Sequence, residues 1–347
     1  MAANYATGIS SSPQNLLQIV VSFLTTQGWT VDASASEGSG WRAHLHKNGL
    51  YVNFRAAMNE LIWYRAAGPV YHERGDGGYG IGLYLGDGYS GASAFYAQSG
   101  GPVRSGDGTT IGVGANLPSG SVAAYHIFDD GADNIVVVVE RHPGIFCHFG
   151  FGPAMAAAGQ PEDFPYFFGS SSGYQNTDNA GLLVRFGINV SAVAPMSPGD
   201  SDYRSDSGST PLYIHSSAFV RVDAATFAGR WVGNAMSTSE NYGSTGRNMR
   251  CALNDNPSMQ GACNESEYIS YRFLRGRAHQ TAYAGAILLP LHCFVLTDPA
   301  ARWAPVGYPP SLFWCDAVGH GYSGGEEYLV GGESYIVFPG FAVWKGA

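Results

Sequence analysis

The chain has 347 residues, of which 45% are hydrophobic and only 13% are charged, about half the charged share of an ordinary globular protein. Its net charge of −9, with Lys47 and Lys345 as the only lysines, argues against nucleic-acid binding, which needs clustered basic side chains. The 48 glycines follow no collagen repeat, the aromatic content argues against disorder, and no apolar run reaches the ~18 residues of a membrane span.

The N-terminal region predicts one helix. Ser12 is a typical N-cap residue, Pro13 suits the first turn, and Gly28 is a typical residue for ending a helix. Apolar side chains recur at helical spacing and form one stripe, which consists of Leu16, Leu17, Val20, Val21 and Leu24. We expect this stripe to bury the helix against a sheet.

After Gly28 the apolar spacing changes from helical to alternating. We expect strands at residues 29–31, 41–46 and 50–55, and the turn Lys47-Asn48-Gly49 joins the last two. We expect these strands to form an antiparallel meander.

Farther along, the stretch from Tyr71 to Gly120 is dominated by glycine. Residues 121–128 form the next expected strand, which leads through Asp129-Asp130-Gly131 into a buried hairpin at 134–152. Four consecutive valines and a Pro143-Gly144 turn make this hairpin the clearest β signal in the chain.

The second half contains aromatic residues at 164–168 and several strand-like runs separated by long polar stretches. The expected strands are residues 182–190, 212–222, 268–273, 284–294 and 328–330. The Ser-, Asp- and Gly-rich segment from Pro195 to Pro211 is the best candidate for an internal boundary. We therefore assign residues 1–200 to a domain of one helix and antiparallel strands. Residues 201–347 form a β-rich continuation or a second β domain.

Three separated segments resemble virion structural proteins of tailed bacteriophages, especially tail and baseplate components. The matching segments read G-W-T-V and W-R-A-H-L-H-K-N-G-L-Y-V-N-F-R (28–31, 41–55), V-V-V-V-E with F-C-H-F-G-F-G (136–140, 146–152), and G-E-S-Y-I-V-F-P-G-F-A-V-W-K-G (332–346). The resemblance implies a small α+β module at the start, a variable surface-loop region near residues 71–120, and a final Y-x-V-F-P strand that rejoins the sheet. With the residue patterns, it predicts a mainly β (α+β) fold with a β-sandwich-like core and long glycine-rich loops.

Two patterns suggest metal ligands, but each has a simpler interpretation. His44 and His46 alternate on one strand face, yet further ligands are not identifiable and hydrogen-bonded histidines are favoured. Asp200-Ser201-Asp202 is similar to the start of a calcium loop, but Arg204 and Ser205 occupy positions that need an oxygen ligand and a glycine. A polar linker is the favoured account of this segment.

The remaining reactive residue types predict no catalytic site. Glu140 follows the four valines and is expected to be partly buried, where it needs hydrogen-bond donors or an arginine. No Cys-x-x-Cys pair occurs among the five cysteines, so we interpret them as buried free thiols rather than zinc ligands; they are Cys147, Cys251, Cys263, Cys293 and Cys315. We assign no catalytic, cofactor or metal residue and do not expect an enzyme.

The function that these observations predict is assembly. We expect a structural subunit of a tailed-phage particle, in the tail tip or baseplate, that associates with copies of itself in a symmetric ring or trimer and with other tail proteins. Localisation in the virion is expected, after synthesis in the cytoplasm of the host bacterium, because the N-terminus has no signal-peptide pattern. The alternative is a receptor-binding or carbohydrate-recognising tail protein that contacts a host surface receptor, and a glycan-degrading enzyme ranks third.

Overall fold

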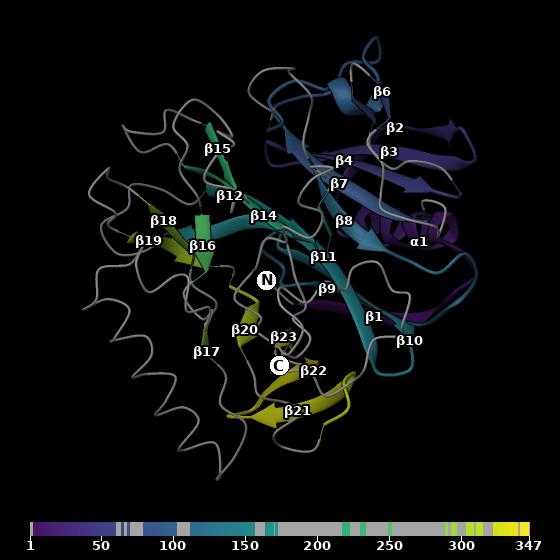
Figure 1. Cartoon of the computed structure of the whole chain (residues 1–347). Coiled ribbons are helices and arrows are strands. Elements are labelled where there is room, and N and C mark those ends of the chain that lie inside the picture. Colours follow the sequence, from purple (N-terminus) through teal and green to yellow (C-terminus); the bar gives the residue numbers. More distant parts are fainter. Residues whose placement is uncertain are drawn as a thin grey trace, which may run out of the picture.

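The fold is mainly β with a single helix in the described part of the chain (Figure 1). The computed structural model describes residues 3–59, 64–65, 68–69, 79–102, 112–156, 164–169, 171–172, 217–222, 230–233, 249–251, 289–290, 293–296, 303–308, 310–314, 322–338 and 341–346. These residues form antiparallel sheets of ten, six and five strands and a two-stranded ribbon of β5 (Tyr64–Arg65) and β6 (Gly68–Pro69). No described helix has the length and apolar character needed to cross a membrane.

Helix α1 (Pro13–Thr26) confirms the N-terminal prediction. The Ser12 hydroxyl accepts a hydrogen bond from the Asn15 N–H at 3.1 Å, which satisfies one of the free donors of the first turn. Gly28 follows the helix with a φ of 86°, a conformation that favours glycine. The predicted apolar stripe is buried and packs against the first sheet.

The first sheet has six strands, and its central strands β3, β4 and β7 contact α1. Its order is β13 (Ser171–Ser172), β8 (Val113–Asn116), β7 (Gly80–Gly86), β4 (Leu50–Ala57), β3 (Gly40–Lys47) and β2 (Thr30–Glu37). The strand expected to start at residues 29–31 is confirmed as β2, which runs on to Glu37, and those expected at 41–46 and 50–55 are confirmed as β3 and β4 with small differences at their ends.

The prediction of loops from Tyr71 to Gly120 is wrong for β7 and β8. Ile81, Leu83 and Leu85 point into the core at alternate positions of β7. In the first half of the strand, the positions next to Ile81 are glycines, Gly80 and Gly82. Glycine is needed because strands pack closely here: a Cβ added at Gly114 would lie 2.1 Å from the carbonyl oxygen of Ile81. Residues 71–78 and 103–111 lie outside the described residues.

The second sheet has ten strands, with the predicted hairpin at its centre. Its main path is β1 (Asn4–Ser10), β9 (Val122–Asp129), β10 (Ile135–His142), β11 (Ile145–Ala156), β12 (Phe164–Gly169), β14 (Ser217–Val222) and β15 (Arg230–Gly233). It continues from β11 through β19 (Trp303–Tyr308) and β18 (Cys293–Leu296) to β16 (Met249–Cys251). Strands from both sides of residue 200 share this sheet. The expected strands at 182–190 and 268–273 lie outside the described residues, as does the segment 195–211, so the boundary near residue 200 stays a prediction.

The hairpin of β10 and β11 is buried on both faces, which explains its run of valines. Val137 and Val139 belong to the core that the second sheet shares with α1 and the first sheet. Val136 and Val138 are also fully buried, but alternation along the strand turns them to the opposite face. A strand covered on both sides reads as continuously apolar instead of alternating.

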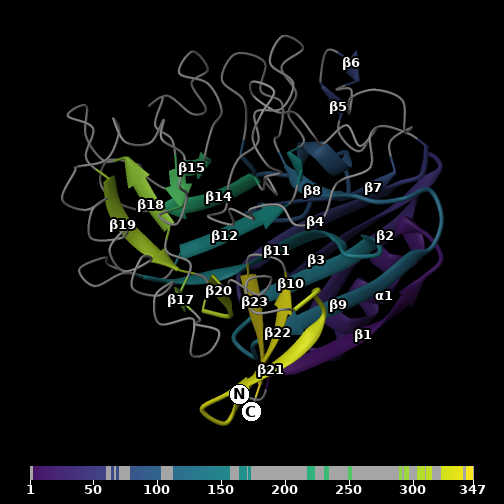
Figure 2. The ribbon, with the colours of Figure 1, turned by 60° about the horizontal axis from the view of Figure 1, so that its bottom comes forward.

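The third sheet covers this opposite face. Its order is β17 (Leu289–Pro290), β20 (Leu312–Trp314), β23 (Phe341–Gly346), β22 (Glu333–Phe338) and β21 (Glu326–Val330). Phe338 packs edge-on against Phe128 and Phe146, with ring centroids 6.4 and 5.3 Å apart, and Phe341 lies 5.3 Å from the ring of His148. The second sheet is thus the middle layer of the fold, as Figure 2 shows from another side.

The C-terminal strands differ from the prediction that a final Y-x-V-F-P strand rejoins the sheet. Strands β22 and β23 pair within the separate third sheet and form no backbone pairs with the second sheet in the described residues. Their side chains Phe338 and Phe341 instead pack against the face of the second sheet. The two ends of the chain nevertheless lie close together in Figure 2, and a Cβ added at Gly346 would be 3.1 Å from the Cβ atom of Ala3. The ammonium group of Lys345 lies 5.2 Å from the ring centroid of Tyr5, so the first and last strands are in direct contact.

A polar contact joins turns of the first two sheets. The Lys47 ammonium lies 2.6 Å from the Asp133 carboxylate, and the Asn48 amide donates to the same carboxylate at 2.7 Å. Nearby, burial raises the pKa values of Asp129 and Asp130. Backbone N–H groups of the turn donate to both carboxylates, so the predicted Asp129-Asp130-Gly131 turn is closed by its own side chains.

Candidate functional site on the first sheet

The outer face of the first sheet carries a row of polar side chains, although its inner face is apolar. On β3 and β4, residues that point toward the core alternate with residues that point away from it. The register places the outward residues in three facing pairs, which are Arg42 with Arg55, His44 with Asn53, and His46 with Tyr51. We call this set the polar face.

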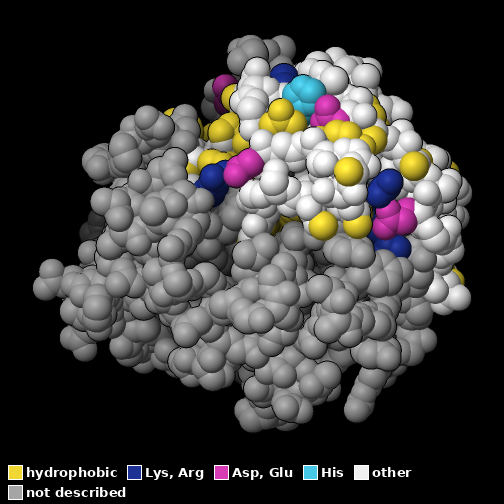
Figure 3. Space-filling view, turned by 90° about the horizontal axis from the view of Figure 1, so that it is seen from above, with side chains coloured by type: hydrophobic (Ala, Val, Ile, Leu, Met, Phe, Trp, Pro, Cys, Tyr) yellow, Lys and Arg dark blue, Asp and Glu magenta, His cyan; other side chains and the backbone are white. Residues whose placement is uncertain are grey.

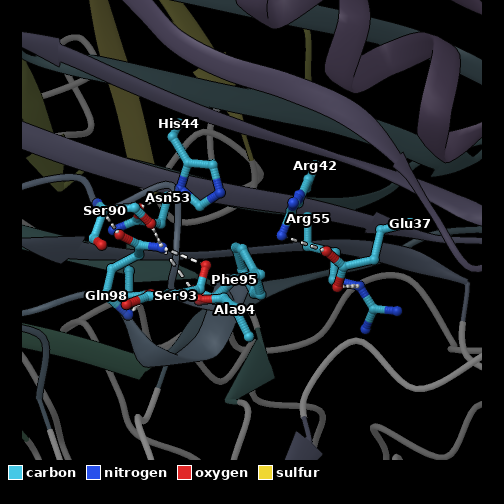
Figure 4. Close-up of polar contacts among 11 residues, drawn as sticks. Glu37, Arg42, His44, Asn53, Arg55, Ser90, Ser93, Ala94, Phe95 and Gln98 are labelled. Carbon is cyan, nitrogen blue, oxygen red and sulfur yellow. Dashed lines mark hydrogen bonds and ion pairs between the residues drawn. The ribbon is translucent and has the colours of Figure 1, made fainter.

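The first pair is held by one carboxylate at the end of β2. Glu37 lies 3.1 Å from the guanidinium of Arg42 and 3.2 Å from that of Arg55, as Figure 4 shows. Arg55 is 1% exposed, so it needs such a counter-charge to remain in the interior. This group therefore anchors the edge strand β2 to the centre of the sheet.

The second pair is a buried histidine and amide. The Nδ1 atom of His44 lies 2.6 Å from the Oδ1 atom of Asn53, and each residue is 1% exposed. Burial lowers the pKa of His44, which leaves a neutral imidazole that shares one hydrogen bond with the amide; which group donates depends on the ring tautomer and the amide orientation. The other polar atom of each side chain, Nε2 of His44 and Nδ2 of Asn53, has no hydrogen-bond partner within the part of the chain that the structure describes.

The third pair is closer to solvent. The Nδ1 atom of His46 lies 2.9 Å from both carboxylate oxygens of Asp32, and the His46 ring stacks on Tyr51 with centroids 5.2 Å apart. His44 and His46 do share one strand face, as predicted, but they use separate partners. The structure confirms the interpretation as hydrogen-bonded histidines, and no cluster of three or more metal-binding side chains occurs in its described parts.

A compact loop from Asp87 to Gly100 lies over the second pair (Figure 4). Its ends meet where the Asp87 N–H donates to the Ser99 carbonyl at 2.9 Å. Inside it, the Gln98 side chain accepts from the Ser90 N–H at 2.7 Å and donates to the carbonyls of Ser90, Ser93 and Ala94. The Tyr84 hydroxyl donates to the Phe95 carbonyl, so strand β7 also holds the loop.

The loop brings two aromatic rings to His44. Tyr89 and Phe95 lie 4.9 and 6.1 Å from the imidazole, measured between ring centroids. Phe95 is fully buried, Tyr89 is half-buried, and the loop tip at Ser90–Ala92 is exposed. The loop is therefore a structured cover with an accessible tip.

Sequence analysis did not identify most of this site. The alternation of polar and apolar residues in W-R-A-H-L-H and Y-V-N-F-R indicates a polar outer face and could have pointed to Asn53 and Arg55. The partners Glu37, Tyr89 and Gln98 come from other elements, and only the folded chain brings them to this face.

Other predicted residues have structural roles or lie elsewhere. Glu140 is half-buried and accepts a hydrogen bond from the Gly144 N–H at 2.8 Å, which confirms the partner expected for it. Cys147 is a buried free thiol, as predicted. The predicted polar loop at Asp200–Asp202 lies outside the described residues, as do Cys263, His292 and Cys315.

Several charged groups of the described residues are paired with opposite charges. In Figure 3, which shows one face of the molecule, basic and acidic side chains lie beside each other between hydrophobic and uncharged regions. The contacts of Glu37 with Arg42 and of Asp133 with Lys47 are examples of such pairs.

A scan against protein-family models and a search of curated proteins found no match to this chain. The His44–Asn53 pair of the polar face is suited to non-covalent binding, because it combines neutral hydrogen-bonding groups with the nearby rings of Tyr89 and Phe95.

Proposed function

We propose that this chain is a structural subunit of a tailed-phage particle, located in the tail tip or baseplate, that acts through protein–protein assembly. One observation carries the proposal: the three segments that resemble phage virion proteins pack into one continuous body. The hairpin β10–β11 lies in the middle layer, α1 with β3 and β4 packs on one face, and β22 and β23 pack on the other. Segments far apart in the sequence thus pack on the two faces of one sheet.

Edge strands with apolar side chains also support an assembling subunit. Ile9 on β1 is 75% exposed and Leu329 on β21 is 70% exposed, and each strand ends its sheet within the described residues. Such edges present backbone groups that a neighbouring chain can pair with. Closure into a symmetric ring or trimer would cover them.

The test is antibody-gold labelling of purified phage particles, viewed by electron microscopy, together with analysis of their denatured proteins. We expect label at the distal tail. Label on the head or neck would retain the virion assignment and overturn the tail-tip placement. Absence of the polypeptide from the particles would overturn the whole proposal.

A second candidate function is recognition of a host receptor or surface carbohydrate. It is favoured by the half-buried Tyr89, which the glycine-rich loop presents next to the polar face. Tyrosine binds well in such positions because its ring is rigid, apolar on its faces and polar at its hydroxyl. Binding of the purified protein to host cells tests this function, and no detectable association would remove it.

A further inference from the structure

His44 and Asn53 together leave one donor and one acceptor unused. With Nδ1–H of His44 donating to Oδ1 of Asn53, the imidazole Nε2 remains an acceptor and the amide Nδ2 a donor. If the amide is turned around, it donates to Nδ1, and the unused atoms become a ring N–H and an amide oxygen. Either assignment leaves one group of each kind, which is a costly arrangement in the interior.

This combination selects a particular ligand chemistry. An anion offers only acceptors and a metal ion or ammonium group offers no acceptor, so neither satisfies both unused atoms. A hydroxyl group donates and accepts, and a sugar carries several hydroxyls on one small ring. The neutral state of His44, which follows from its lowered pKa, agrees with an uncharged ligand.

The surroundings supply the apolar contact that a sugar also needs. The ring of Tyr89 lies 4.9 Å from that of His44, and this tyrosine is half-buried at the exposed loop tip. The Asn53 amide lies at the base of the same loop, since a Cβ added at Gly86 would be 3.4 Å from Nδ2. One aromatic ring and two hydrogen-bonding side chains thus meet beneath a single loop.

We propose that His44, Asn53 and Tyr89 form a binding site for a neutral saccharide unit, with hydroxyls bound by the histidine and amide and the sugar ring packed against the tyrosine. Entry requires the Tyr89 side chain to turn outward, while the Gln98 hydrogen bonds keep the rest of the loop in place. This proposal rests on the second candidate function and is independent of the location of the chain in a virion.

The experiment is saturation-transfer difference NMR on the full-length protein with glucose, galactose, mannose and N-acetylglucosamine as probes. We expect transfer to at least one sugar and about a tenfold loss of affinity in Tyr89→Ala, the size of one aromatic contact. Asn53→Leu should abolish transfer, and Tyr322→Ala, which removes a half-buried tyrosine on the third sheet, should leave it unchanged.

The proposal is overturned if the wild type shows no transfer to any of the sugars, or if Tyr89→Ala binds as well as the wild type. If circular dichroism shows that Asn53→Leu does not fold, the loop variant Tyr89→Ala still tests the saccharide site. The result is separable from particle labelling: distal-tail label without sugar transfer rejects the saccharide site alone, and sugar transfer without particle label rejects the structural role alone.

Discussion

Ser12 defines the start of α1 through one side-chain hydrogen bond, with Pro13 beside it in the first turn. At the same scale, Asn53 and His44 bind each other in the interior and present unused polar atoms. Both cases follow from the cost of leaving a buried or terminal polar group without a partner. The difference is that Ser12 satisfies a local backbone donor, whereas the His44–Asn53 pair needs a group from outside the pair.

The Ser12 cap leads to a prediction of stability. Ser12→Ala removes the acceptor for the Asn15 N–H and should lower the free energy of unfolding by about 1 kcal/mol. Ser11→Ala is the matched control, because Ser11 is exposed and only its backbone N–H makes a hydrogen bond. Urea denaturation followed by circular dichroism measures both; equal stability of the two variants would contradict the capping role.

Among the elements, β7 shows that glycine-rich sequence does not always form loops. Gly114 on the neighbouring strand β8 permits close approach to β7, Gly86 at the end of β7 permits close approach of Ser99 in the loop, and the Ile, Leu and Tyr side chains of β7 supply the buried surface. The loop that follows is likewise organised, because Gln98 and Tyr84 hold its backbone. Close packing between strands is the physical reason for the glycines in this part of the sheet.

Close packing at Gly114 makes it intolerant of a side chain. A Cβ there would meet the Ile81 carbonyl oxygen at 2.1 Å, so Gly114→Ala should destabilise the protein by about 1–3 kcal/mol. At Gly120, a Cβ would meet nothing within 4 Å, so Gly120→Ala should change stability by less than about 0.5 kcal/mol. Thermal unfolding of the two variants measures this difference, and similar melting temperatures would refute the β7–β8 packing.

For the whole molecule, the aromatic layer between the second and third sheets connects the two ends of the chain. Phe338 is fully buried there and contacts His126, Phe128 and Phe146. His126 and His148 lie in the same layer, and the Tyr5 hydroxyl is 2.7 Å from Nδ1 of His126. The packing of the third sheet should therefore be sensitive to truncation of an aromatic side chain in this layer and to protonation of its two histidines.

Loss of volume is tested by Phe338→Ala. Removal of this side chain leaves a cavity between two sheets and should cost about 3–5 kcal/mol of stability. Leu329→Ala on β21 is the control, because Leu329 is 70% exposed and its truncation should have little effect. Chemical denaturation compares them, and an equally small change for Phe338→Ala would exclude the proposed packing of the third sheet.

Protonation of the two buried histidines predicts that the stability of the fold depends on pH. Burial lowers the pKa values of His126 and His148 from 6.5 to about 4, so the folded state resists protonation that the unfolded chain accepts. Stability should be complete above pH 6.5 and should fall as the pH decreases toward 4, by an amount on the order of 1–3 kcal/mol for each histidine.

The measurement is the melting temperature as a function of pH for the wild type, His148→Phe and Leu329→Ala. His148→Phe should have a smaller slope between pH 6.5 and 4, because the fully buried titrating ring is gone. Leu329→Ala changes an exposed side chain that does not titrate and should keep the wild-type slope. An unchanged slope in His148→Phe would show that this residue does not govern acid stability.

The sequence by itself determined the local elements: the capped helix, the turn at Asn48 and the hairpin around Pro143-Gly144, because their signals lie within a few neighbouring residues. It also determined the mainly β class. Only the tertiary structure decided that β22 and β23 form a separate covering sheet, and that Glu37, Tyr89 and Gln98 complete the polar face. Those arrangements depend on which buried faces pack together between segments that are far apart in the sequence. Local periodicity indicates that one face of an element is buried, but it does not identify the surface that packs against that face.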